Sequence, residues 1–167
     1  MTHVINKQIE RTGMTQQSLA DIGLTTKSNV SMMVKGDRNI SSDTYRAFAT
    51  NSNDGVFITD TLNEFSDGFS TPAHNDELYY DHPGLIKNQL IKEMKEAIYA
   101  LENCSFLKRP EYMSREEKEE IIRTMTECED VLFQGQLFLN MTCKHIKKNQ
   151  RDLAKAHEQK LKMERRI

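Results

Sequence analysis

Three glycines divide the first fifty residues of this chain into short segments: Gly13, Gly23 and Gly36. Glycine commonly follows the end of a helix, and each segment carries apolar residues at helical spacing. The candidate helix-capping residues are Thr15, Thr25 or Thr26, and Ser41 or Ser42. We therefore predict four short helices around one core made of Val4, Ile5, Ile9, Met14, Leu19, Ala20, Ile22, Val30, Met33, Val34, Tyr45, Phe48 and Ala49.

A fifth helix is predicted between Asp54, a capping residue, and Gly68, a terminating one. It would complete an N-terminal domain of residues 1–68. The following residues, 69–83, contain two prolines and three acids, which is typical of a linker. We expect this linker to dock through Leu78, Tyr79 and Tyr80.

Residues 84–167 are predicted to form a helical module of an antiparallel helix pair and a C-terminal helix. Apolar residues at helical spacing run from Gly84 to about Asn103, and Pro110 interrupts the pattern. Ser114 and Glu117 then form a capping box ahead of a long helix. The whole chain is therefore expected to be all-α.

The net charge of −2 is unevenly distributed along the 167 residues. By segment, residues 1–50 carry +2, residues 51–83 carry −7, residues 84–143 carry −3, and residues 144–167 carry +6. Only the surface that faces a phosphate backbone has to be positive. The two ends of the chain are therefore the candidates for contact with nucleic acid, although the basic tail could equally be a solvated helix end.

The second and third predicted helices are joined by a tight turn, which is the arrangement that places a helix in the major groove of DNA. The stretch from Met14 to Gly36 resembles the lambda-repressor-like, Xre-type helix-turn-helix of phage and bacterial regulators. Leu19-Ala20, then Val30-Ser31, then Gly36 follow the spacing of that family without a gap. The resemblance implies a five-helix fold for residues 1–68, with the helix from Thr26 to Val34 reading DNA.

The resemblance also implies roles for individual residues. Gln16 matches a position that binds a phosphate and supports the third helix, and Lys27, Ser28 and Met32 match positions that meet base edges. The complete predicted DNA-binding set is Gln16, Gln17, Thr26, Lys27, Ser28, Asn29, Met32, Lys35, Arg38 and Asn39. The last three belong to the loop that grips the DNA backbone.

Two residues depart from the family pattern. Gly23 stands one place early and is followed by Leu24, which indicates a shortened second helix and a longer turn. This leaves open which residues from Thr25 to Ser28 face the bases. Val34 stands where an acidic residue is common. The alternative interpretation is an ordinary small helical domain with solvated surface lysines.

The resemblance favours a sequence-specific transcriptional regulator that represses phage or mobile-element genes. Its expected partners are double-stranded DNA and a second copy of the chain, bound through residues 84–167, because dimers read two half-sites. A monomeric three-helix bundle is the alternative for these residues. The rival function is an anti-repressor or antitoxin-like adaptor whose C-terminal helices capture a second regulatory protein.

Enzymatic activity is not expected, because the sequence contains no GxGxxG, P-loop, HExxH or GxSxG motif. No cofactor is predicted. No metal is predicted either, since the candidate ligands His74, Asp76, Glu77, Asp81 and His82 have no ligand spacing and suit a solvated linker. The three cysteines are expected to be reduced, and the lack of a signal or membrane segment predicts a cytoplasmic protein.

Overall fold

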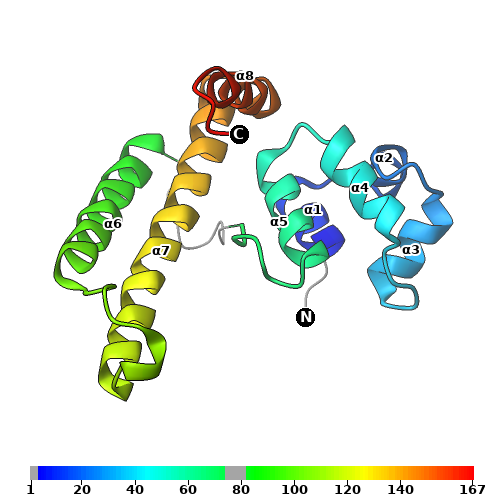
Figure 1. The fold of residues 1–167 in the computed structure, drawn as a ribbon. Coiled ribbons are helices and arrows are strands. Elements are labelled where there is room, and N and C mark those ends of the chain that lie inside the picture. Colours follow the sequence, from blue (N-terminus) through cyan, green and yellow to red (C-terminus); the bar gives the residue numbers. More distant parts are fainter. Residues whose placement is uncertain (1–3, 74–81) are drawn as a thin grey trace.

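The computed structural model describes residues 4–73 and 82–167, and these are all-α (Figure 1). Five short helices pack together at the N-terminal end, followed by a long antiparallel pair and a C-terminal helix. The helices are α1 (Val4–Thr12), α2 (Gln16–Ile22), α3 (Lys27–Lys35), α4 (Ser42–Asn51), α5 (Gly55–Phe65), α6 (Pro83–Asn103), α7 (Arg115–His145) and α8 (Gln150–Met163). A single 3-10 turn, Pro110–Tyr112, lies between α6 and α7. No helix in the described ranges is long and apolar enough to cross a membrane.

The N-terminal core contains the residues that periodicity predicts. Ile5, Leu19, Val30 and Phe48 are fully buried, and the other predicted core residues except Ala49 pack around them. Ala49 is half-buried and lies outside this core, whereas Ala47 is the buried alanine of α4. Phe48 also meets Phe57 of α5 edge-on, with 5.1 Å between the ring centroids. The fifth helix therefore completes this core. It is shorter than the predicted segment, because it ends at Phe65 and a turn leads to Gly68.

The predicted helix caps are present. The side chains of Thr15, Thr26, Ser41 and Asp54 each accept a backbone hydrogen bond at the start of α2, α3, α4 and α5. They satisfy amides that a helix start would otherwise leave without a partner. The structure thus selects Thr26 over Thr25 and Ser41 over Ser42.

Gly23 follows α2. Its φ is −79°, which other residues also adopt, so the backbone conformation does not require a glycine at this position. A Cβ at this position would lie 2.6 Å from Cε1 of Phe48, so the glycine permits close packing against α4. The left-handed conformation falls on Leu24, which has φ of 49° and is 78% exposed. The turn between α2 and α3 therefore contains a strained, exposed leucine.

Asp54 links α1 to α5. Its carboxylate caps α5 and forms an ion pair with Arg11, while Gln8, which is buried, donates a hydrogen bond to it at 3.3 Å. Burial alone would raise the pKa of Asp54. The hydrogen bond and charge of Arg11, with the Phe57 amide, hold that pKa below its ordinary value. Gln8 is a core residue that apolar periodicity does not reveal.

The long pair α6 and α7 packs along its length, with Ile86, Leu137 and Met141 forming a second, smaller core. The predicted capping box starts α7: Ser114 accepts from the Glu117 amide, and Glu117 accepts from the Ser114 amide. Residues 74–81 lie outside the described residues, and so does the predicted docking of Leu78, Tyr79 and Tyr80.

The two parts of the chain meet where α5 lies against α7 and α8 (Figure 1). Asn140 of α7 donates to the hydroxyl of Thr59 of α5 at 3.2 Å, and this contact is buried. Arg151 of α8 donates from Nη2 to the carbonyls of Ala49 and Ser52, each at 2.9 Å. Hydrogen bonds rather than a large apolar contact therefore hold the two parts together.

Candidate nucleic-acid interface

The α2–α3 unit forms a compact helix-turn-helix. The Thr25 amide donates to the Ala20 carbonyl at 3.0 Å, which anchors the turn to the end of α2. At the other end of α3, Gly36 has φ of 81°, and the amide of Asp37 donates to the Met32 carbonyl at 2.9 Å. These bonds give α3 two defined ends, a feature of a rigid recognition element.

One side of α3 packs into the domain and the other faces solvent. Val30 and Met33 are buried, whereas Lys27, Ser28 and Lys35 are exposed. The packing partners of α3 are α1 and α2, and α6, α7 and α8 lie on the far side of the domain (Figure 1). The C-terminal helices therefore leave the outer side of α3 open.

The cations at this surface differ in how they are held. Among the described residues, Lys27 and Lys35 have no ion-pair or hydrogen-bond partner. Arg38 is exposed, and its Nη1 donates to Oδ1 of Asn29 at 2.9 Å. Both lysine ammonium groups are thus available to a phosphate, and Arg38 is fixed close to α3.

Asn29 differs from the role that the sequence suggests. Its Nδ2 donates to Oγ1 of Thr25 at 3.0 Å, and its Oδ1 accepts from Arg38. The amide is therefore engaged within the protein and joins the turn, the helix and the following loop. In this state Asn29 positions its neighbours rather than presenting a free amide.

The remaining predicted residues fall into two groups. Thr26 caps α3, and Gln17 donates to Asp21 at 2.9 Å, so both already have protein partners. Gln16 and Met32 are half-buried, and Asn39 is exposed beyond Gly36. No hydrogen bond from the Gln16 side chain to α3 is found in the described part of the chain, so the support that the resemblance implies is not seen here.

A group of three acids lies on the α6–α7 pair. Ligand oxygens of Glu93, Glu127 and Asp130 lie within 4.8 Å of one another. Glu93 is buried, accepts a hydrogen bond from Gln89, and lies 3.7 Å from Nζ of Lys92. Because these contacts account for its charge, the cluster is not assigned as a metal site.

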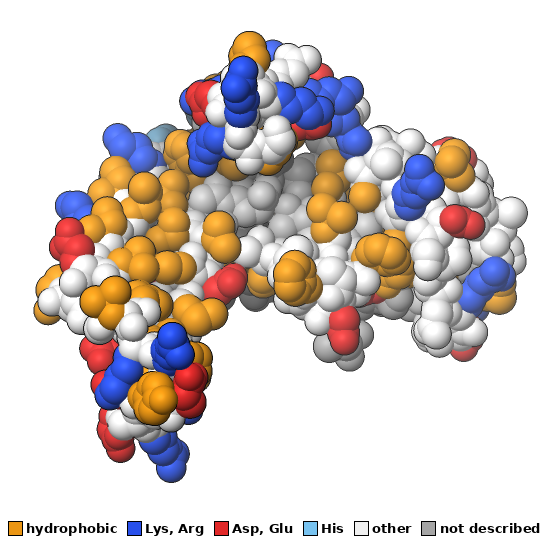
Figure 2. All heavy atoms as spheres, viewed as in Figure 1, with side chains coloured by type: hydrophobic (Ala, Val, Ile, Leu, Met, Phe, Trp, Pro, Cys, Tyr) orange, Lys and Arg blue, Asp and Glu red, His pale blue; other side chains and the backbone are white. Residues whose placement is uncertain are grey.

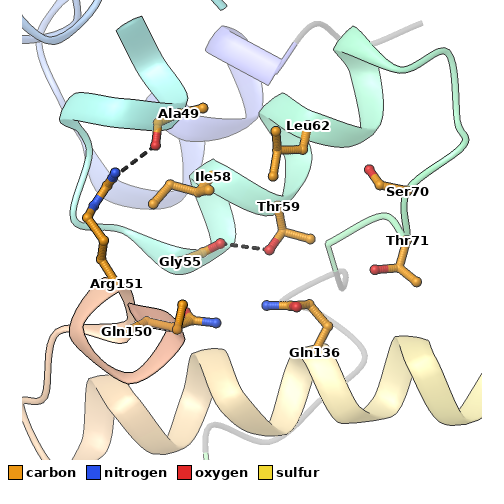
Figure 3. Close-up of a pocket in the computed structure, with 11 residues that line it drawn as sticks. Ala49, Gly55, Ile58, Thr59, Leu62, Ser70, Thr71, Gln136, Gln150 and Arg151 are labelled. Atoms are coloured by element: carbon orange, nitrogen blue, oxygen red, sulfur yellow. Dashed lines mark hydrogen bonds between the residues drawn. The ribbon is translucent and has the colours of Figure 1, made fainter. Parts of the chain in front are cut away.

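The sequence analysis did not single out the residues at the junction of the two parts. Gln136, Gln150 and Arg151 line a cavity of about 300 Å³ beside α5 (Figure 3). They lie between 74 and 102 positions from the α4 and α5 residues around the cavity, so no local pattern links them. A glycine directly after the Asp54 cap is the one local signal of a close approach.

No family model, curated protein or solved structure gives a significant match to this chain. The resemblance to lambda-repressor-like domains therefore rests on the motif between Met14 and Gly36 and on the geometry of α2 and α3.

Proposed function

We propose that this chain is a sequence-specific DNA-binding regulator and that α3 lies in the major groove. The observation that carries the proposal is the open outer side of α3, which bears Lys27 and Lys35, two cations with no ion-pair partner in the described part of the chain. An exposed helix with a capped start and a packed inner side matches how helix-turn-helix proteins present a recognition helix. Repression of phage or mobile-element genes is the role that the family resemblance favours.

Within this proposal, Lys27 and Ser28 contact base edges, because they are the exposed residues in the first turn of α3. A lysine can donate to the guanine acceptors O6 and N7, and a serine hydroxyl pairs with several base edges. Lys35, Arg38 and Asn39 contact the phosphate backbone from the end of α3 and the following loop. The half-buried Met32 offers an apolar contact to a thymine methyl group.

The test is selection of binding sites from a randomised duplex library with the full-length chain. We expect enrichment of a defined sequence, and an affinity that falls as the salt concentration rises. Lys27→Glu should lower affinity for the enriched duplex at least tenfold. Lys118→Glu is the matched control, since Lys118 is exposed on α7 away from α3. Failure to enrich any sequence, or equal losses in both variants, would contradict the proposal.

The α6–α7 pair supports the dimer that the proposal requires. Ile91, Met94, Ile98 and Leu101 repeat on α6 at alternating spacings of three and four residues, and all are at least 40% exposed. Figure 2 shows hydrophobic side chains gathered over α6 and α7. A stripe with this spacing is typical of helices that pack knobs-into-holes against other helices.

The long helix α7 carries a second stripe. Met125, Leu132 and Leu139 recur every seven residues, and Met125 is 59% exposed. A second copy related by a two-fold axis presents the same two stripes, so they can pack against one another in a four-helix arrangement. We therefore propose that a second copy of the chain covers these stripes, which places two α3 helices on one duplex.

Sedimentation equilibrium tests the dimer. We expect twice the 19.4 kDa chain mass for the native sequence, and the chain mass for the double variant Ile98→Asp, Met125→Asp. The double variant Asn88→Asp, Thr126→Asp is the matched control, because it adds the same charge at exposed polar positions of α6 and α7. A native chain that remains monomeric at high concentration would contradict the dimer and favour the adaptor function instead.

A further inference from the structure

The cavity between the two parts of the chain has the size of a small-molecule site. It occupies about 300 Å³ between α4, α5, α7 and α8, which is the lower end of the usual range for ligand pockets. Its apolar walls are formed by Ala49, Ile58, Leu62 and Ala154. These walls suit the hydrocarbon part of a ligand.

The polar end of the cavity carries hydrogen-bond donors. In Figure 3 the side-chain amides of Gln136 and Gln150 point toward one another below α5. Nε2 of Gln136 donates one hydrogen to Oδ1 of Asn140 at 2.9 Å, which leaves its second hydrogen for another acceptor. An acceptor oxygen between these two glutamines would therefore meet a donor from Gln136.

The orientation of Gln150 supplies the second donor. Its Oε1 is buried without a hydrogen-bond partner and lies against Gly55, where a Cβ would be 2.2 Å away. Because the oxygen faces the start of α5, the Nε2 group faces the cavity, as Figure 3 shows. Two amide nitrogens thus converge on one end of the space, which Thr59, Ser70, Thr71 and Arg151 also line.

The charge of the residues that line the cavity indicates the charge of the ligand. Among residues 4–73 and 82–167, Arg151 is the one charged residue that lines the cavity, and none of these described lining residues is a carboxylate. The Arg151 guanidinium donates from Nη2 to the carbonyls of Ala49 and Ser52 and keeps its positive charge at the cavity edge. A cationic ligand would be repelled there, whereas an anionic oxygen would be attracted.

We propose that this cavity binds a small organic monocarboxylate, with its carboxylate between Gln136 and Gln150 and its hydrocarbon chain against Ile58 and Leu62. The inference is independent of DNA binding, because it concerns a site on the side of the N-terminal domain away from α3. Such a ligand touches α5, α7 and α8 together and therefore strengthens the junction between the two parts of the chain.

The experiment titrates octanoate, 1-octanol and octylamine into the full chain with 13C-labelled methyl groups. We expect saturable shifts of the Ile58, Leu62 and Ala154 methyl signals, with octanoate binding at least tenfold more tightly than 1-octanol and octylamine leaving these signals unchanged. Equal binding of octanoate and 1-octanol would overturn the proposal. Shifts confined to the exposed α6 and α7 stripes, or no saturable shift, would also overturn it.

Two variants test the geometry. Ala154→Phe fills the cavity and should abolish octanoate binding, while Ala156→Phe, its control on the exposed surface of α8, should retain it. Gln136→Glu places a negative charge beside the carboxylate. We expect it to weaken octanoate binding more than tenfold and to leave 1-octanol binding unchanged. An equal loss for both probes would overturn the assignment of the polar end.

Discussion

Arg38, in the loop after α3, donates a hydrogen bond from Nη1 to Oδ1 of Asn29, which lies within α3, at 2.9 Å. The same Asn29 amide is held from its other side by the hydroxyl of Thr25. Two residues predicted to bind DNA are thus joined to one another. Asn29 orders the arginine at the surface where the proposed duplex lies.

This contact predicts a non-additive pair of substitutions. Asn29→Ala and Arg38→Ala should each lower affinity for the selected duplex, and each should reduce the slope of log affinity against log salt by about 1. If Asn29 acts through Arg38, the double variant should bind no more weakly than Arg38→Ala alone. Fluorescence anisotropy with the four proteins measures this. Additive losses, with relaxed preference at one base pair, would show that Asn29 reads a base itself.

Leu24 provides a test of the turn. Its φ of 49° is unfavourable for leucine, and its side chain is 78% exposed, so its replacement removes little packing. Asparagine adopts the left-handed region more readily. We expect Leu24→Asn to raise the free energy of unfolding by about 0.5–1 kcal/mol, measured by urea denaturation. Leu107→Asn, at an exposed leucine outside the left-handed region, should have a smaller effect.

Asp54 predicts how stability depends on pH. Because its pKa is lower in the folded state than in the unfolded state, its contribution is complete above the unfolded value of about 3.9 and is lost as the pH falls through the folded value. Asp54→Asn should lower stability by about 2 kcal/mol at pH 7, because Arg11 loses a charged partner. The deficit should shrink below pH 4.

The measurement is urea denaturation of both proteins between pH 7 and pH 2. Asp37→Asn, at an exposed acid in the loop after α3, is the control and should follow the native profile. A deficit for Asp54→Asn that stays constant over this range would contradict the assigned ion pair.

Local signals in the sequence were sufficient to predict much of the fold. Thr15, Asp54 and Ser114 cap the helices they were expected to cap, because capping depends on residues only two or three positions away. The N-terminal core was also predictable, since one apolar stripe per short helix leaves little choice of inner face.

Longer-range features were not predictable in this way. On α6 the apolar residues form two overlapping stripes, and periodicity alone could not show that Ile86 and Ala97 face inward while Ile98 faces solvent. Gly23 was expected to end α2, but its close approach to Phe48 depends on tertiary packing. For the candidate interface, the sequence indicated the exposed lysines, whereas the bond between Asn29 and Arg38 required the geometry of the loop.

Arg151 predicts that the junction of the two parts can be loosened by one substitution. Its guanidinium binds two carbonyls at the end of α4, where the helix dipole also favours a positive charge. Arg151→Leu removes these bonds but keeps an apolar side chain beside the cavity. We expect hydrogen exchange to quicken at least tenfold in α8 and at the end of α4, with no change in the α6–α7 pair, as measured by mass spectrometry.

Lys155→Leu is the control for this prediction. Lys155 is exposed and lies one turn further along α8, so its substitution should leave the α4 exchange rates unchanged. Unchanged exchange in Arg151→Leu would contradict this role of the arginine and would mean that the remaining contacts of the junction, such as the hydrogen bond between Asn140 and Thr59, hold the two parts together.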